Sequence, residues 1–304
     1  MKESNNLFER FNPSFFPIED SLTFPISFRQ DVWLRLKKNP GAILGISILA
    51  FLLLMSLIGP SLNSYTYYTN HLEHKNQPPS LKFWFGTDDL GRDIFTRVWW
   101  GARISLLVGF SAAVIDLIFG VIWGTVAPLT GKKTDEVMMR ICDILYAIPY
   151  LLTVILLTVM VGPGLWTIIF AMTLTGWISM ARIVRGQILQ LKQQDYILAA
   201  IALGASNRRL IFKHLIPNAI GPIVTTMTLT IPAAIFTEAF LSFLGLGVQA
   251  PIASWGVMIS DSIGAMRYYP WRLFFPATLL TMTIFSLNLL GDNLRDVLDP
   301  RMNS

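Results

Sequence analysis

Six apolar runs separated by polar segments dominate the pattern along this chain of 304 residues. A helix needs about 20 mostly apolar residues to cross a hydrocarbon core of roughly 30 Å, and each run is close to that length or longer. The first run, from Gly41 to Gly59, contains no charged residue and should insert unaided. The expected spans cover residues 41–59, 104–128, 137–161, 165–184, 219–245 and 273–290. The pattern therefore predicts an all-α integral membrane protein with six transmembrane helices.

The polar segments divide the chain into expected regions. The amino-terminal segment lacks the charged, apolar and small-residue order of a signal peptide, so we expect it to stay in the cytoplasm. Within it, Phe28–Lys38 places apolar residues near one helical face, which favours either an interfacial helix or a plain juxtamembrane anchor. The expected regions are an amino-terminal segment (1–40), a first transmembrane helix (41–60), an external loop (61–100), a membrane core (101–293) that includes a polar loop over 190–217, and a cytoplasmic tail (294–304).

Basic residues predict the orientation of the spans. Seventeen Lys and Arg residues lie in the segments on the side of the amino terminus, and six lie on the opposite side. An excess of Lys and Arg marks the cytoplasmic side of a membrane protein. Both termini are therefore predicted in the cytoplasm, with residues 61–100 outside.

Composition agrees with a lipid environment. Hydrophobic residues make up 53% of the chain and charged residues 14%, whereas soluble domains have roughly 25% charged residues. The net charge of +5 comes from Lys and Arg at the ends of apolar runs, without a basic face interleaved with aromatic residues, so topology explains it better than nucleic-acid binding. The single cysteine, Cys142, cannot form an internal disulfide and is expected to be a small packing residue.

The polar stretch from Tyr196 to Asn218 carries the most informative pattern in the chain. Its alanine pair at 199 and 200 permits a short, closely fitting helix, and Gly204 marks the end of that helix. A second helix is expected to begin at Leu210, and Pro217 is expected to separate it from the next span. From spacing alone, the stretch is either a docking loop for a partner or an ordinary cytoplasmic connector.

This stretch and several other sequence segments resemble those of a known protein family. The phrases are FGTDDLGRDIFTRVWWGARISLLVG (85–109), ARIVRGQIL (181–189), YILAAIALGASNRRLIFKHLIPN (196–218), EAFLSFLGLGVQAPIASWGVMISD (238–261) and LLGDNLRDVLDPR (289–301). With them, the chain resembles the C-type permease subunit of dipeptide and oligopeptide ABC importers, over nearly everything after residue 30. The shorter phrases SMARIVRGQ and SWGVMISD resemble the oligopeptide branch more than the dipeptide or nickel branches.

The resemblance implies an importer-type ABC permease fold with a cytoplasmic coupling helix, in the cell inner membrane. Such a subunit pairs with a second homologous permease subunit and with two ABC ATPase subunits, which bind ATP and Mg. An external binding protein delivers the peptide, and transport proceeds by alternating access. The resemblance implies no catalytic residue, cofactor or metal site in this chain. The residues expected to contact the ATPase are Ala199, Ala200, Leu203, Gly204, Arg208, Arg209 and Pro217.

Two positions in the loop depart from the family pattern. Leu198 and Ile201 stand where the family usually has a glutamate and a basic residue, so any salt bridge between those two is absent. Apolar residues that face an aqueous cleft are unfavourable in a solvated loop but suit burial against a partner. The sequence therefore predicts a more hydrophobic docking contact at Ala200, Leu203 and Gly204, with the two arginines at its rim.

Three acidic residues lie inside the expected spans, where a charge costs about 2.5–3.5 kcal/mol at a helix centre. Asp143 follows Arg140 by about one helical turn, so an ion pair within the helix is expected. Asp116 has no partner within a turn and is a candidate pathway residue. Glu238 lies near the external end of the fifth span, where it either lines the translocation path or braces the glycine-containing turn at 245–247.

Other function classes find little support in the sequence. The segment TGKKT (130–134) has Val126 in place of the first phosphate-loop glycine and Lys133 in place of the hydroxyl residue. The acidic segment 86–93 lacks the alternating ligands of an EF-hand calcium loop. A secondary transporter would show paired half-chain repeats with interrupted spans. A nickel or other small-solute permease of the same family remains the alternative, although no external pathway rich in His, Met or Cys supports it.

Overall fold

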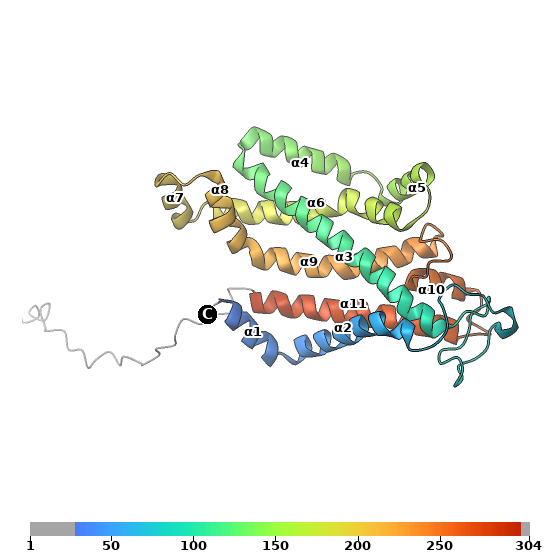
Figure 1. The fold of residues 1–304 in the computed structure, drawn as a ribbon. Helices are drawn as coiled ribbons and strands as arrows, with labels where there is room; N and C mark the ends of the chain where they lie inside the picture. The colour runs from blue at the N-terminus through green and yellow to red at the C-terminus, as the bar shows by residue number, and fades with distance from the viewer. Residues whose placement is uncertain (1–27, 299–304) are drawn as a thin grey trace, which may run out of the picture.

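Five long helices dominate the computed structural model, which describes residues 28–298 (Figure 1). All five are long and apolar enough to span a membrane, and each overlaps one of the predicted spans. Their bounds are α2 Pro40–Ile58, α3 Ile94–Val126, α6 Leu165–Leu191, α9 Ile216–Phe243 and α11 Trp271–Leu298. The predicted all-α membrane architecture is therefore confirmed within the described range.

The remaining predicted span, 137–161, is not one straight helix. It consists of α4 (Lys132–Tyr146) and α5 (Tyr150–Val161), which are bent by 77° relative to one another. Pro149 lies in the break, and proline lacks an N–H donor and disfavours helical geometry in the residue before it. The bent pair is either a broken span or a re-entrant segment, so the helices described here make five or six crossings.

Helix α3 begins earlier than predicted, inside the expected external loop 61–100. Asp93 caps its first turn, because one carboxylate oxygen accepts a hydrogen bond from the Thr96 N–H at 2.8 Å. The loop between α2 and α3 is therefore shorter than expected by the first turns of α3.

The central helix α3 crosses the bundle and packs along α6 and α9 (Figure 1). Small residues allow this close approach. A Cβ atom added at Gly120 would lie 2.5 Å from the Met180 side chain of α6, and one at Gly109 would lie 2.5 Å from Ile235 of α9. Packing around small residues is typical of helices that associate in a membrane, where lipid is as apolar as the side chains. Helix α11 packs against α2 and α9 and completes the bundle.

The two ends of the bundle carry different elements (Figure 1). At one end lie α1 (Phe28–Lys38), α7 (Asp195–Ala202), α8 (Asn207–Arg209) and the last residues of α11. At the other end lie α10 (Trp255–Ile263) and the loop over residues 62–93. The short turns are η2 Gly59–Ser61, η3 Leu72–His74, η4 Ala127–Leu129 and the π-helical η5 Leu210–Leu215. The helix predicted over Phe28–Lys38 is confirmed as α1, and its position in a membrane interface stays a prediction.

Candidate coupling loop and translocation residues

The short helix α7 is attached to the bundle by one apolar face. Ile197 is 1% exposed and belongs to the same buried cluster as Leu210 and Leu215. The cluster also includes Val184 and Ile188 of α6. One side of α7 is therefore fixed against the bundle, and the opposite side faces away from it.

Helix α7 ends in a Schellman motif. The Ala205 N–H donates to the Ala200 carbonyl at 3.0 Å, and the Gly204 N–H donates to the Ile201 carbonyl at 2.9 Å. Gly204 has a φ of +80°, a left-handed conformation that glycine adopts without the steric cost of a side chain. The helix end predicted at Gly204 is therefore confirmed.

The outward side of α7 is apolar. Leu203 is 90% exposed, and Leu198 and Ile201 are about half exposed. Gly204 is exposed beside them, whereas Ala200 is half-buried and packs against the cluster beneath the helix. The predicted contact surface therefore centres on Leu203 and Gly204, with Ala200 at its inner edge.

The chain after Ser206 forms one continuous helical unit over residues 207–243, so the expected separation at Pro217 is wrong. Ser206 caps the first turn, and a π-helical turn over Leu210–Leu215 leads directly into α9. In this wider turn the Ile216 N–H donates to the Ile211 carbonyl. Pro217 has no N–H to donate, and the change in winding just before it lets the helix continue without a break.

The other predicted coupling residues lie on exposed surface at the same end of the bundle. Two of them, Arg208 and Arg209, border a shallow hollow of about 530 Å³ together with Phe212 and Lys213. The exposed residues of this group are Ala199, Arg208, Arg209 and Pro217. The structure thus gathers all seven predicted coupling residues at one end, six of them exposed and Ala200 half-buried.

Two polar contacts that the sequence did not reveal hold the base of this region. Arg185 of α6 donates to both carboxylate oxygens of Asp135 in α4, each at 2.6 Å. Lys192, just after α6, donates to the Pro128 carbonyl at 2.7 Å. The sequence did offer a sign of the Arg185 contact. Arg182 and Arg185 lie three residues apart and so share one face of the helix, which indicates a partner on that side.

Asp143 pairs with Arg182 of α6 at 2.9 Å, in place of the ion pair with Arg140 that the sequence favoured. The Arg182 guanidinium also lies over the Tyr146 ring, 4.7 Å from its centroid. This cation–π contact holds the guanidinium beside α4, so the arginine of the neighbouring helix reaches the carboxylate. Helical spacing could indicate only partners on the same helix.

Glu238 lies inside a cluster of serine hydroxyls. Its side chain is fully buried and accepts hydrogen bonds from Ser105 of α3 at 3.1 Å, from Ser242 of α9 at 2.8 Å and from Ser254 at 2.7 Å. Ser254 also caps α10. Glu238 therefore joins α3, α9 and the start of α10, and not the turn at 245–247 that the sequence expected it to brace. The choice between a pathway role and a bracing role stays a prediction.

Asp116 occupies a different environment. It lines a cavity of about 570 Å³ whose walls come from α3, α5, α6 and α9. Glu238 does not line this cavity. The structure therefore separates the two predicted pathway candidates, one beside open space and one enclosed by hydroxyl groups.

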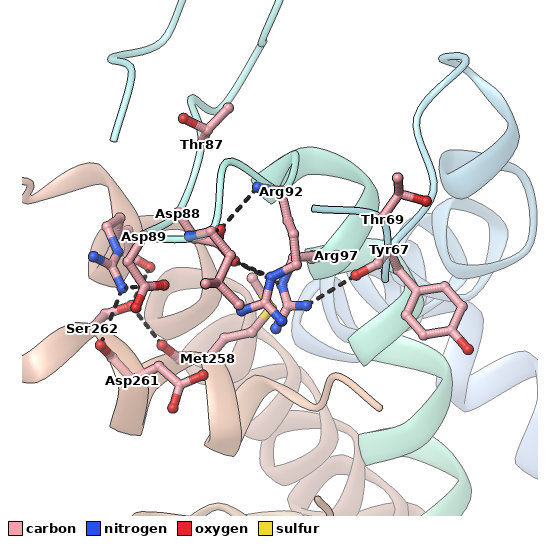
Figure 2. A network of polar contacts seen from close by, with 12 residues as sticks. Tyr67, Thr69, Thr87, Asp88, Asp89, Arg92, Arg97, Met258, Asp261 and Ser262 are labelled. Carbon is pink, nitrogen blue, oxygen red and sulfur yellow. Dashed lines mark hydrogen bonds and ion pairs between the residues drawn. The ribbon is translucent and has the colours of Figure 1, made fainter. Parts of the chain in front are cut away.

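An ion-pair network (Figure 2) lies between the loop over residues 62–93, α3 and α11, at the end of the bundle opposite α7 (Figure 1). Asp88 accepts from Arg92 at 2.7 Å and lies 3.4 Å from Arg97. Asp89 lies 3.2 Å from Arg272, at the start of α11. All three arginines are buried. The network thus ties the loop before α3 to α3 and α11.

Two further contacts extend this network. Arg97 donates to the Tyr67 carbonyl at 2.9 Å (Figure 2). Arg272 donates to the Asp261 carbonyl at 3.2 Å. Burial raises the pKa of the Asp261 carboxyl above its usual value, and the nearby Arg97 charge opposes that shift. Of the carboxylates in the acidic segment 86–93, Asp88 and Asp89 therefore neutralise buried guanidinium groups, and Asp93 caps α3.

Comparison with known families matches both parts of the chain. The model of the binding-protein-dependent transport system inner membrane component matches residues 116–304. The model of the N-terminal transmembrane domain of oligopeptide transport permease C matches residues 27–79.

Curated relatives match along nearly the whole chain. The oligopeptide transport system permease protein OppC of Bacillus subtilis (strain 168) is 58% identical over 277 residues, which cover 91% of each chain. The dipeptide transport system permease protein DppC of the same organism is 55% identical over 285 residues, covering 93% of this chain and 89% of the relative. OppC of Escherichia coli (strain K12) is 39% identical over 277 residues, covering 90% of this chain and 92% of the relative.

Among solved structures, the inward facing MetNI methionine ABC transporter matches with a TM-score of 0.55 at 21% identity. The match covers 66% of this chain and 94% of that chain. At that identity it shows the fold alone, which is the ABC importer permease type that the sequence led us to expect. The family match over most of the chain and the identity to curated permeases go further than the fold. On both grounds, the chain belongs to the family of binding-protein-dependent transport system inner membrane components.

Proposed function

We propose that this chain is a permease subunit of an ATP-driven peptide importer, that it forms half of the translocation pathway, and that it docks an ATPase through residues 196–218. The observation that carries the docking proposal is the outward side of α7, where Leu203 is 90% exposed. An exposed apolar surface on a capped helix suits burial by a partner. The peptide cargo is supported by the relatives, which are named as oligopeptide and dipeptide permeases.

The proposed assembly contains a second homologous permease subunit, two ABC ATPase subunits and an external peptide-binding protein. ATP and Mg bind to the ATPase subunits, and this chain has no catalytic role or cofactor of its own. ATP binding shifts the inward and outward populations only as far as the ATPases bind the two states with different affinity. In this proposal, the contact on α7 transmits that difference to the membrane helices.

In the proposed topology, the chain lies in the cell inner membrane and both termini are in the cytoplasm. Helix α1, helix α7 and the last residues of α11 lie at the same end of the bundle, as an even number of crossings requires (Figure 1). The excess of Lys and Arg on that side favours the cytoplasm. The expected regions are retained as 1–40, 41–60, 61–100, 101–293 and 294–304, with the start of α3 placed before residue 100.

Oligopeptides are the proposed cargo rather than dipeptides. Identity alone hardly separates the two, because OppC and DppC of one organism are 58% and 55% identical to this chain. The preference rests on the phrases SMARIVRGQ and SWGVMISD. A nickel or small-solute permease of the same family is the alternative cargo class, and a secondary transporter is the alternative mechanism.

The first experiment is to purify the tagged chain from detergent extracts, to identify the accompanying proteins by mass spectrometry and to measure ATP hydrolysis. We expect recovery of a second permease subunit and P-loop ATPases, with turnover stimulated by a peptide-loaded binding protein. A lone chain that transports under an ion gradient would contradict the proposal. Stimulation of ATP hydrolysis by nickel but not by peptides would support the ABC importer assignment and contradict the peptide cargo.

A substitution in the proposed contact tests the docking assignment. Gly204→Val places a β-branched side chain at φ +80°, where left-handed geometry costs about 1–2 kcal/mol for a residue with a Cβ atom. No atom lies within 4 Å of an added Cβ, so the bundle itself is not crowded. We expect complexes that still hydrolyse ATP but import peptide at least about tenfold more slowly, because the contact on α7 is displaced.

The matched control for this test is Gly162→Val, at the end of α5. Gly162 also has a positive φ, +95°, and also has no atom within 4 Å of an added Cβ. It lies outside the proposed docking region, so ATP hydrolysis and uptake should stay coupled. Normal uptake in the Gly204→Val complex would reject the assignment.

A further inference from the structure

The cavity lined by Asp116 has the size of a small-molecule site. Its volume is about 570 Å³, within the range of roughly 300–1,000 Å³ that ligand pockets have. Helices α3, α5, α6 and α9 contribute its lining, and of the lining residues that the structure describes, Asp116 alone is charged. The other polar lining residues carry hydroxyl groups: Tyr150, Thr175, Ser179, Thr226, Thr230 and Thr237.

The Asp116 carboxylate is built into this wall, and it forms no ion pair with any residue between 28 and 298. The residue is only 5% exposed, and its Oδ1 atom has no hydrogen-bond partner among the described residues. A Cβ atom added at Gly176 of α6 would lie 2.5 Å from Asp116 Oδ2, so the absence of a side chain at Gly176 makes room for the carboxylate. A buried carboxylate in a membrane helix is costly unless it has a partner or faces a watery path.

A second unsatisfied polar atom lines the same cavity. The Tyr150 hydroxyl of α5 is buried and has no hydrogen-bond partner among the described residues. Two unmatched polar atoms around one cavity are unusual, because most buried polar groups in proteins have a partner. Both groups can accept a hydrogen bond from a ligand.

The threonines of α9 offer the same kind of group. The hydroxyls of Thr226, Thr230 and Thr237 each donate to a backbone carbonyl four residues earlier, at 2.8, 2.9 and 2.8 Å. Because each hydroxyl hydrogen is already donated to the helix backbone, these groups can only accept hydrogen bonds from other partners. The cavity therefore offers one carboxylate and several acceptors, a combination that suits a cation with several N–H donors.

We propose that this cavity is a subsite for the ammonium group of a peptide in transit, with Asp116 as its counter-charge and the Tyr150 and α9 hydroxyls as acceptors. The α-ammonium group carries three donors and is common to peptides of any sequence, so this contact does not select among side chains. This inference rests on the proposed peptide cargo. It adds a charge preference to a pathway that otherwise offers hydroxyl and apolar groups.

The test places a reporter thiol in the cavity. Ala233 lines the cavity on α9 and is exposed, so Ala233→Cys in a Cys142→Ala background gives this chain a single thiol. Labelling is carried out on the complete importer, and the label on this chain is measured after the subunits are separated. The rate of labelling is measured with two thiosulfonate reagents, one carrying a trimethylammonium group and the other a sulfonate, and the two rates are compared. Relative to Leu81→Cys, on a residue that is 99% exposed in the outer loop, we expect the cationic reagent to be favoured by about tenfold or more.

Peptide protection identifies the ligand group. Tri-alanine should slow labelling of Ala233→Cys, whereas N-acetyl-tri-alanine, which has no ammonium group, should not. Asp116→Asn should abolish both the cationic preference and the protection. The control Asp143→Asn removes a carboxylate that is half exposed and paired with Arg182, and it should change neither.

Several outcomes would overturn the inference. They are the absence of labelling in the assembled importer, equal labelling by the two reagents, and protection by both peptides or by neither. If Asp116→Asn fails to assemble, the difference in protection between tri-alanine and N-acetyl-tri-alanine, measured with Asp116 intact, still tests whether the cavity binds an ammonium group. Uptake of tri-alanine is measured in parallel, and its absence despite a cationic preference would reject the proposed cargo while retaining the charged cavity.

Discussion

Glu238 illustrates, at the scale of single residues, how a carboxylate is accommodated inside the bundle. Three serine hydroxyls, from α3, from α9 and from the cap of α10, donate to its two oxygens. Each hydroxyl would lose its acceptor if the side chain were shortened. The carboxylate therefore holds together parts of the chain that are distant in sequence.

Glu238→Ala and Glu238→Gln form a matched pair that tests this bracing role. Alanine leaves the three hydroxyls without their acceptor, and each buried group left unsatisfied costs about 1–3 kcal/mol. Glutamine keeps a carbonyl oxygen that Ser242 and Ser254 can share. We expect less assembled complex and a lower melting temperature for alanine, with most of the loss restored by glutamine. Normal assembly but no transport in the alanine variant would instead indicate a pathway role.

The sequence showed which acidic residues are unusual but not what surrounds them. Asp116, Asp143 and Glu238 were recognisable because each lies in an apolar run. Their surroundings come from other helices: Arg182 of α6 for Asp143, and Ser105 and Ser254 for Glu238. Contacts between helices depend on packing, which periodicity along one helix does not report.

Helix α7 shows, at the scale of elements, how far local rules reach. Its small residues and its end at Gly204 were predictable because helix capping depends on neighbours in sequence. The continuous unit 207–243 was not, because Pro217 usually marks a helix boundary and nothing in the local sequence announces the π-helical turn before it. The same limit applies to the 77° bend between α4 and α5, where the apolar run continues through the break.

Leu203→Asp tests the apolar character of the docking surface. Leu203 is 90% exposed, so a charge there leaves the packing of the bundle unchanged. If an ATPase buries this side chain, the charge should weaken ATPase binding by about tenfold or more. Binding is measured by titrating ATPase subunits onto permease complexes in nanodiscs. Leu81→Asp, on a residue that is 99% exposed in the loop at the opposite end of the bundle, is the control and should bind ATPase normally. Equal binding by both variants would contradict the hydrophobic contact.

At the scale of the whole molecule, the two ends of the bundle are held differently. The end with α7 exposes apolar side chains, whereas the opposite end encloses three arginines between the loop over residues 62–93, α3 and α11. The spans that place these two ends were predictable because apolar runs must match the thickness of a membrane. The arginine network was not, since its members come from residues 88–97 and 261–272.

Asp88→Asn tests how much this network stabilises the end of the bundle opposite α7. Asp88 neutralises both Arg92 and Arg97, and removing one partner from a buried ion pair costs about 3–5 kcal/mol. We expect a clear fall in the melting temperature of the purified complex. Asp89→Asn should cost less, because the Asp89 side chain is 49% exposed and water can replace part of its contact with Arg272. Equal losses for both variants would contradict this account.

Helix α9 has a consequence for how force could travel through the subunit. At about 1.5 Å per residue its 28 residues extend for roughly 42 Å, from the neighbourhood of α7 to the serine cluster at Glu238, and its middle forms a wall of the Asp116 cavity. One helix thus joins the proposed docking surface, the cavity and the serine cluster around Glu238. Pro222 and Pro232 each remove a backbone hydrogen bond within it, so they are the points of lowest bending stiffness. A displacement applied at α7 would therefore tilt the part of α9 that lines the cavity, about the end of the helix that Glu238 holds through its three hydrogen bonds.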